Sequence, residues 1–146
     1  MSKSGFGEIF VMLSLLIGNF FYSVSKKSLP ITNIHLETKM NATTVDLGNI
    51  SSAFSAAYGI SKLLGGILSD VLPSYHLFCV GLYLAGILNL AILFAVDIPT
   101  IYILWAINGL GQGVGGPALS KLVVQFFPTK VRSSTWGNLS FVRHIY

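Results

Sequence analysis

The sequence predicts an all-α integral membrane protein, and three observations support that prediction. Hydrophobic residues make up 53% of the chain and charged residues 10%, whereas soluble domains carry about 25% charged residues. Long apolar runs follow one another with short breaks, and the run over residues 77–96 holds no charged residue. A run of about 20 apolar residues crosses roughly 30 Å of hydrocarbon as a helix. Helix is expected throughout, because lipid offers no hydrogen-bond partners to an open backbone.

Four transmembrane helices and the start of a fifth are expected in a single membrane domain over residues 1–146. Pro30 is expected to end the first helix and Pro128 the fourth, because proline lacks the N–H group that a helix interior needs. The expected spans cover about 9–29, 47–68, 77–96 and 98–127, with a partial fifth span from about 136.

The connections between these spans predict how the chain is oriented. Lys130 and Arg132 follow the fourth span, and the positive-inside rule places such residues in the cytoplasm, together with the N-terminus. The polar connection over residues 32–46 then lies on the opposite side and contains the sequon Asn41-Ala42-Thr43. Asn41 is therefore an acceptor for glycosylation if this side faces a lumen.

Composition argues against several other classes of protein. The net charge of +4 is dispersed along the chain, so no nucleic-acid partner is expected. The single cysteine, Cys79, lies in an apolar run and permits no internal disulfide. The three histidines are scattered, and no nucleophile–base pair is recognisable. We therefore expect no metal, no cofactor, no catalytic residues and no enzyme activity.

Three lysines lie within or against the apolar spans, where lysine is costly: Lys26, Lys27 and Lys62. Two interpretations are open for Lys26 and Lys27, which either extend to the lipid head groups or face a cavity that holds an anion. Tyr22 precedes Lys26 by four residues and Tyr58 precedes Lys62 by four, so each pair shares one helix face. An ammonium and a phenol hydroxyl on one face are suited to phosphate or sugar hydroxyls, although membrane tyrosines also serve in packing.

The fourth span contains a glycine-rich stretch over residues 108–117. Gly109 and Gly113, and likewise Gly111 and Gly115, are spaced four apart, which allows a neighbouring helix to approach closely. The same glycines favour bending of this span. Asn108 and Gln112 share one face and require polar partners in lipid, so they either bond across helices or contact a substrate.

Several of these segments resemble one family. Residues 55–62, Ser-Ala-Ala-Tyr-Gly-Ile-Ser-Lys, followed by Gly-Ile-Leu-Ser-Asp at 66–70, resemble the second helix of the organophosphate:phosphate antiporters of the major facilitator superfamily. Residues 22–28 resemble the first helix of that group, and 112–121 resemble its fourth-helix signature. Within the group the chain is similar to the sugar-phosphate exchangers. The resemblance covers essentially the whole chain.

The resemblance implies roles for individual residues. It implies that Lys26, Lys27 and Lys62 bind the substrate phosphate, and that Asp70 helps to close the inner face. Tyr22, Tyr58 and Gln112 are expected to line the cavity, and Gly109, Gly113 and Gly115 to pack against neighbouring helices. Three differences from the family pattern stand out: Lys26 replaces an arginine, Tyr75 or His76 replaces a basic residue after Asp70, and 116–118 read Gly-Pro-Ala in place of Trp-Pro-Pro.

The resemblance also implies a mechanism and partners. The expected fold is part of the N-terminal six-helix half of such a transporter, in which two halves rock around a central site. The expected function is exchange of a sugar phosphate, glucose 6-phosphate above others, for inorganic phosphate in the endoplasmic reticulum membrane. Membrane lipid and a missing C-terminal half or complementary chain are the other expected partners, so the chain is not expected to transport alone. Two alternatives remain: a non-transporting membrane interaction module, and a facilitator for another organic anion.

Overall fold

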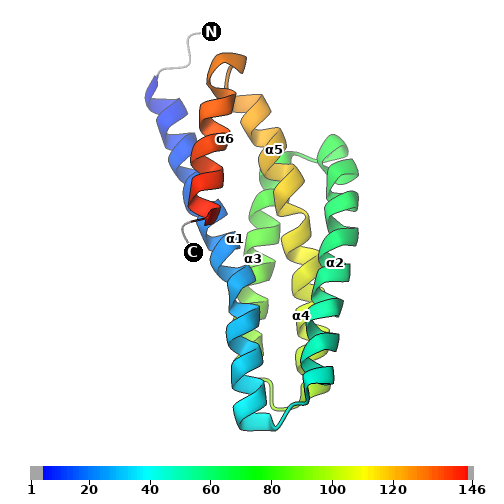
Figure 1. Cartoon of the computed structure of the whole chain (residues 1–146). Coiled ribbons are helices and arrows are strands. Elements are labelled where there is room, and N and C mark those ends of the chain that lie inside the picture. Colours follow the sequence, from blue (N-terminus) through cyan, green and yellow to red (C-terminus); the bar gives the residue numbers. More distant parts are fainter. Residues whose placement is uncertain (1–4, 145–146) are drawn as a thin grey trace.

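The computed structural model describes residues 5–144 as a bundle of helices without a strand among them (Figure 1). The predicted all-α class is therefore confirmed. The helices are α1 (Gly5–Met40), α2 (Thr44–Val71), α3 (Ser74–Ile92), α4 (Ile98–Gly113), α5 (Gly115–Phe126) and α6 (Thr129–His144).

The long helices run alternately up and down the bundle (Figure 1). α2 and α4 form the most extensive contact between any two helices of the described chain. α5 continues in the direction of α4, and α6 lies against the N-terminal half of α1. The connection between α2 and α3 therefore lies at the same end of the bundle as the one between α5 and α6, whereas the α1–α2 and α3–α4 connections lie at the other end (Figure 1).

Two clusters of buried apolar side chains hold the bundle together, one toward each end. The first joins α1, α3, α5 and α6, and the second joins α1, α2, α3 and α4. The first contains Leu15, Phe78, Ala118, Leu119, Leu122, Val123, Phe127 and Leu139. The second contains Leu29, Leu36, Ala42, Ile50, Phe54, Ile92, Ile101 and Trp105.

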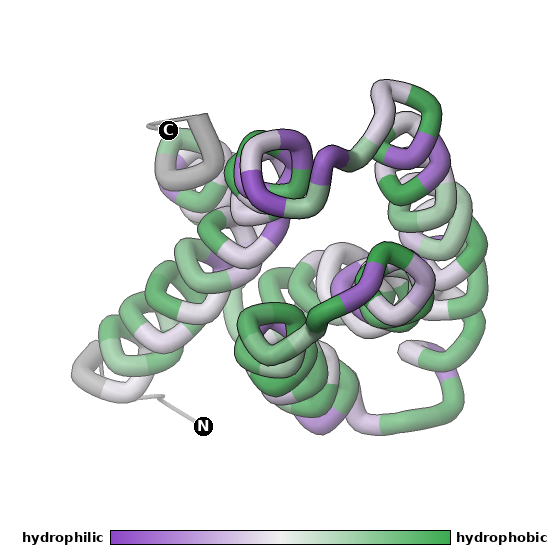
Figure 2. The backbone as a smooth tube through the Cα atoms, turned by 90° about the horizontal axis from the view of Figure 1, so that it is seen from below, coloured by the Kyte–Doolittle hydropathy of each residue, from purple (hydrophilic) through white to green (hydrophobic). Residues whose placement is uncertain are grey.

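Large apolar side chains also cover the outside of the bundle. Leu63 on α2, Tyr83 on α3 and Phe94 after α3 are all at least 74% exposed. Figure 2 shows apolar positions, in green, around the outer sides of the helices as well as between them. Two helical segments, Ile9–Met40 and Ser74–Ile92, are long and apolar enough to cross a membrane by length and composition. An apolar exterior is the surface expected of helices that face lipid.

The first helix does not end at Pro30, contrary to the sequence-based expectation, but continues to Met40. Proline removes one backbone donor, yet nearby hydroxyls bond the helix carbonyls: Thr32 Oγ1 donates to the Ser28 carbonyl over 2.8 Å. Leu36, which is 1% exposed, anchors the polar extension in the second core cluster. Burial of this side chain explains why residues expected to form a loop are helical. The helix ends at Met40, directly before Asn41, whose φ of 49° is left-handed.

The predicted fourth span, 98–127, is divided into two helices rather than one, with the break at Val114. Pro117 has no N–H to donate to the carbonyl of Gly113, four residues earlier, so the helical ladder is interrupted there. Asp97 begins α4 as its N-cap, accepting a hydrogen bond from the Thr100 backbone N–H over 2.9 Å.

The last helix begins at Thr129, earlier than the expected start near residue 136. Arg132 explains the early start, because its Nε donates to the Phe127 carbonyl and its Nη2 to the Val124 carbonyl. These bonds satisfy carbonyls at the end of α5 and fix the turn at Pro128. The second helix is also longer than the expected 47–68, and α3 lies a few residues earlier than 77–96.

Candidate functional site

A cavity of about 490 Å³ lies between the two core clusters and is lined by five helices. Its volume falls within the range of about 300–1,000 Å³ that is typical of small-molecule pockets. α1 contributes about half of the lining. The lining residues are Asn19, Tyr22, Ser23, Lys26, Lys27, Leu29, Pro30, Phe54, Ser55, Tyr58, Phe78, Gln112, Gly115, Gly116 and Leu119.

The charge of this cavity comes from Lys26 and Lys27. No Asp or Glu side chain of residues 5–144 lines it with them. Both lysines are exposed, and a lining whose charges are all positive favours an anion. Both lysines stand on the middle turns of α1, between the turn that carries Tyr22 and the one that contains Pro30.

The ammonium of Lys26 lies 4.3 Å from the ring centre of Tyr58 on α2. This is a cation–π contact, since such contacts form within about 6 Å of a ring centroid. Sequence spacing had paired Tyr58 with Lys62 on the same helix face, whereas the structure pairs it with a lysine of another helix. Tyr58 itself stacks on Phe54, with ring centres 6.1 Å apart, which holds the ring in the cavity wall.

The structure places Lys62 apart from the other two lysines. Lys62 is exposed on α2 and does not line the cavity. It remains close to the rim, because a Cβ atom at Gly116, a lining residue, would lie 4.0 Å from Lys62 Cε. The predicted trio of phosphate-binding lysines is therefore represented in the cavity by Lys26 and Lys27.

Tyr22 lines the cavity with its ring, but its hydroxyl points into the helix packing. The hydroxyl donates to the Phe78 carbonyl of α3 over 3.0 Å. A Cβ at Gly81 would lie 2.2 Å from this hydroxyl, and one at Gly115 would lie 2.5 Å from Tyr22 Cζ. The two glycines thus form a notch for the phenol. Its single proton is used within the fold, so a bond from Tyr22 to a bound phosphate is not available in this arrangement.

The other glycines singled out from the sequence lie where α4 meets α2. A Cβ at Gly109 would lie 2.5 Å from the Phe54 carbonyl oxygen, and one at Gly113 would lie 2.6 Å from the Tyr58 carbonyl oxygen. The hydroxyl of Ser61 on α2 donates to the Leu110 carbonyl across the same contact. The close approach of the two backbones thus depends on the absence of side chains at these glycines.

A chain of polar side chains runs from the cavity into the bundle. Gln112 Nε2 donates to Asn108 Oδ1 over 3.0 Å, and Asn108 Nδ2 donates to Asn89 Oδ1 over 3.0 Å. The hydroxyl of Ser28 on α1 lies 3.2 Å from the same Asn89 oxygen. The sequence analysis did not single out Asn89. A polar residue in the apolar run of α3 was the available signal, because such residues need partners in lipid.

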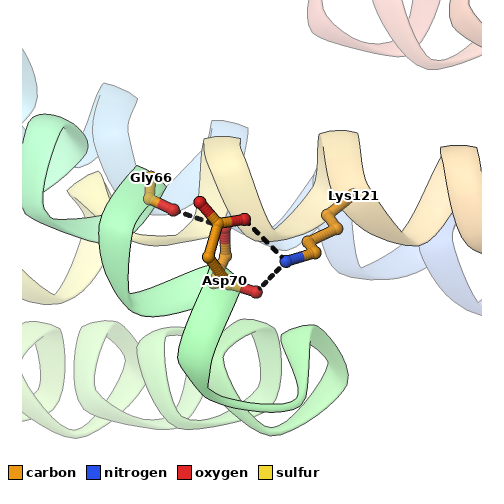
Figure 3. Close-up of polar contacts among 4 residues, drawn as sticks. Gly66, Asp70 and Lys121 are labelled. Atoms are coloured by element: carbon orange, nitrogen blue, oxygen red, sulfur yellow. Dashed lines mark hydrogen bonds and ion pairs between the residues drawn. The ribbon is translucent and has the colours of Figure 1, made fainter.

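Asp70, the residue expected at an inner gate, forms an ion pair at the end of α2. Lys121 of α5 donates to Asp70 Oδ1 over 2.8 Å and also to the Ser69 carbonyl (Figure 3). The rings of Tyr75 and His76 instead contact each other at an angle of 46°, with ring centres 4.1 Å apart. The sequence analysis did not pair Lys121 with Asp70. The end of α2, where Asp70 lies, and α5, which carries Lys121, are near the same end of the bundle (Figure 1), so the topology could have suggested the pair.

Asn41, the predicted glycosylation acceptor, is exposed between α1 and α2. Thr43, the third residue of its sequon, caps α2: its Oγ1 accepts from the Asp46 N–H over 3.2 Å. No three His, Cys, Asp or Glu side chains gather as metal ligands in the part of the chain that the structure describes.

The fold and the cavity together define a helical bundle with an apolar exterior and a cationic pocket. Residues 15–143 match the Major Facilitator Superfamily profile. The chain therefore belongs to the Major Facilitator Superfamily, whose members are integral membrane proteins.

Similar proteins confirm the resemblance to the organophosphate:phosphate antiporters of this superfamily that the sequence analysis described. A probable hexose phosphate transport protein of Chlamydia trachomatis is 29% identical over 127 residues, which cover 87% of this chain and 28% of the relative. The membrane sensor protein UhpC of Salmonella typhimurium is 25% identical over 127 residues, 87% of this chain and 29% of the relative. The glycerol-3-phosphate transporter of Bacillus subtilis is 27% identical over 128 residues, 85% of this chain and 29% of the relative. The chain thus spans less than a third of the length of these relatives.

Proposed function

We propose that this chain forms the phosphate-binding part of the N-terminal half of a transporter that exchanges a sugar phosphate for inorganic phosphate. The observation that carries the proposal is the cavity whose charged lining consists of Lys26 and Lys27. Relatives named as hexose phosphate and glycerol-3-phosphate transporters support a phosphorylated substrate.

In this mechanism the phosphate group enters the cavity and is held by the two ammonium groups. Lys26 is positioned over the Tyr58 ring before the anion arrives, so little ordering of its side chain is required on binding. Lys replaces the arginine of the family pattern and offers a compact charge rather than a bidentate fork. A second half, or a complementary chain, would supply the opposing wall, and rocking of the halves would expose the site to each side in turn.

The finer assignments belong to the same proposal. Glucose 6-phosphate is the proposed sugar phosphate, and the endoplasmic reticulum membrane is the proposed location, with the N-terminus in the cytoplasm. Lys62 is proposed to face the second half at the rim of the cavity, and the Asp70–Lys121 pair to close the cytoplasmic end. Asn41 would then face the lumen.

Phosphate binding by the purified chain in lipid nanodiscs tests the proposal. Replacing Lys26 or Lys27 with Ala is expected to weaken binding of inorganic phosphate by roughly 10- to 150-fold, because a hydrogen bond to a charged group contributes about 1.5–3 kcal/mol. Lys39→Ala is the matched control, since Lys39 is exposed on the same helix and does not line the cavity. Equal weakening by all three substitutions would contradict the proposal.

A sensor is the second candidate function, and the relative named as a membrane sensor protein favours it. A sensor of this kind would bind a sugar phosphate in the same cavity without exchanging it. The two candidate functions can be distinguished in proteoliposomes that contain the longest natural protein in which this sequence occurs. Exchange of labelled phosphate for unlabelled sugar phosphate is expected of the transporter, whereas a sensor would bind the anion without exchange.

A further inference from the structure

The hydrogen-bonded chain behind the cavity fixes the orientation of one side chain in its wall. Asn108 is fully buried, so its amide has no access to water for a replacement partner. Gln112 Nε2 donates to Asn108 Oδ1, and Asn108 Nδ2 donates onward to Asn89. Turning the Gln112 amide alone would place its oxygen against another oxygen. The orientation of Gln112 is thus linked to that of the two asparagines.

This orientation leaves the oxygen of the Gln112 amide for the cavity. Within the described residues, Gln112 Oε1 accepts no hydrogen bond, and Gln112 is one of the lining residues. The cavity therefore combines two kinds of polar group. Lys26 and Lys27 supply donors and positive charge, and Gln112 supplies an acceptor that requires a donor from whatever is bound.

The Gln112 acceptor distinguishes between anions that the two lysines alone would bind equally well. Inorganic phosphate carries an O–H group at neutral pH, and a sugar phosphate carries ring hydroxyls. Sulfate has the shape and charge of a phosphate dianion but no O–H group at neutral pH. Sulfate would therefore place its oxygens against Gln112 Oε1 and leave that acceptor without a donor. A buried polar group without a partner is costly.

We propose that Gln112 Oε1 accepts a hydrogen bond from an O–H group of the bound anion and thereby selects phosphate and sugar phosphates over sulfate. Asn108 and Asn89 are positioning residues that hold the amide in this orientation. The inference rests on the proposed function, because it presupposes that an anion occupies the cavity.

The test compares binding of inorganic phosphate and of sulfate to the purified chain in nanodiscs by calorimetry. Phosphate is expected to bind roughly 5- to 150-fold more tightly than sulfate, the range that one unsatisfied buried group implies. Gln112→Leu removes the acceptor and is expected to bring the ratio of the two dissociation constants close to one. Asn49→Leu is the control, because Asn49 is exposed on α2 and lies outside the hydrogen-bonded chain.

Two variants at Asn108 separate positioning from a general structural effect. Asn108→Leu removes the partner of Gln112 Nε2, so the discrimination against sulfate is expected to fall. Asn108→Asp, whose fully buried carboxyl is expected to be neutral, retains an oxygen that accepts from Gln112 Nε2 and an O–H that donates to Asn89, so the discrimination is expected to persist. Loss of discrimination in both variants would contradict the positioning role, since the aspartate keeps the orienting bond.

The outcomes distinguish this inference from the proposed function. Equal binding of phosphate and sulfate by the unsubstituted chain, with both weakened by Lys26→Ala, would overturn the inference and leave the anion site standing. Unchanged discrimination in Gln112→Leu would also overturn it. Absence of any phosphate binding would overturn the proposed function and this inference with it.

Discussion

The contact between Lys26 and Tyr58 makes the ring of Tyr58 part of the anion site without requiring its hydroxyl. Tyr58→Phe keeps a ring face 4.3 Å from the ammonium, so phosphate affinity should change little. Tyr58→Leu removes the face and should weaken phosphate binding by roughly 2- to 30-fold, which corresponds to about 0.5–2 kcal/mol for a cation–π contact. Calorimetric titration of the two variants side by side is the measurement. Equal losses would assign the effect to the hydroxyl instead.

The two partners of the Asp70–Lys121 pair should differ in their importance. Asp70 is 77% exposed at its side chain, and an exposed pair contributes about 0.2–1 kcal/mol, so Asp70→Asn should lower the free energy of unfolding only slightly. Lys121 also donates to the Ser69 carbonyl near the end of α2. Lys121→Met should therefore destabilise the chain by about 1.5–3 kcal/mol.

Unfolding of both variants in mixed micelles, followed by tryptophan fluorescence, measures the difference. The double variant serves as the control: if Lys121 acts on two partners, its loss should outweigh that of Asp70 in either background. A larger loss for Asp70→Asn would show that the ion pair dominates.

Residue types were easier to predict from the sequence than residue partners. Helical spacing placed Tyr22 with Lys26 and Tyr58 with Lys62, because spacing describes neighbours on one helix. The contacts that matter in the structure cross between helices: Tyr58 with Lys26, and Tyr22 with the Phe78 carbonyl. Such pairs depend on the rotation and tilt of each helix, which apolar runs do not encode.

At the scale of helices, the contact between α2 and α4 depends on glycine. A Cβ at Gly109 would lie 2.5 Å from a backbone oxygen of α2 and 3.1 Å from Ala57 Cβ, and neither can move without shifting the helix. Gly109→Ala should therefore destabilise the chain by about 1–3 kcal/mol, the usual effect of overpacking. Thermal unfolding of the chain in detergent is the measurement.

Gly86 on α3 provides the matched control, because a Cβ there meets no atom within 4 Å. Gly86→Ala should be neutral or stabilising, since alanine is favoured over glycine in a helix by about 1 kcal/mol. Similar destabilisation by both substitutions would mean that backbone propensity, rather than helix contact, governs the result.

The start of α4 should respond to acid. Asp97 accepts from the Thr100 N–H, and hydrogen bonds from the Thr100 side chain and then its backbone hold the pKa of the Asp97 carboxyl below its ordinary value. A lowered pKa in the folded state means that the stabilisation is fully present above the unfolded value, about 3.9, and is lost as pH falls through the folded value. The cap should therefore weaken below about pH 4.

Asp97→Asn tests this, because asparagine also caps helices well but does not titrate. Fluorescence of Trp105, which is fully buried on α4, reports the helix in a Trp136→Phe background. The unsubstituted chain should show a transition in acid that is smaller in Asp97→Asn. Identical acid profiles would place the titrating group elsewhere.

The helix ends show which local signals are strong. Asp97 and Pro99 mark the start of α4, because its first residue, Ile98, lies between them. The prolines were less reliable as ends: Pro30 lies within α1, and Pro117 helps to divide the predicted fourth span. The helix continues past Pro30 because of the packing contacts that bury Leu36 in the second core cluster. These are tertiary effects that a single segment does not contain.

At the scale of the whole molecule, the fold class followed from composition, because long apolar runs with so few charges are typical of helices that cross a membrane. The family followed from the resemblance of segments such as 55–70 to one known group. The cavity did not follow from them in the same way. Its lining is drawn from five helices, and Lys26 and Lys62 were expected in it together although Lys62 lies outside. A site between helices is specified by their packing, which the sequence expresses through glycines and buried amides rather than through its charges.

The alternating course of the helices makes a definite prediction about orientation. The connection that contains Pro73 lies at the same end of the bundle as the start of α6, which carries Lys130, and the connections that contain Asn41 and Val96 lie at the other end (Figure 1). If the positive-inside rule governs insertion, the end with Lys130 and Arg132 faces the cytoplasm. Single cysteines placed at these exposed positions in a Cys79→Ala background should divide into two groups in sealed microsomes. Pro73→Cys and Lys130→Cys should react with an impermeant maleimide from outside the vesicle, whereas Asn41→Cys and Val96→Cys should react only after the membrane is permeabilised. A reversed division would invert the proposed orientation and place Asn41 away from the glycosylation machinery, while a mixed division within either pair would contradict the arrangement of the helices itself.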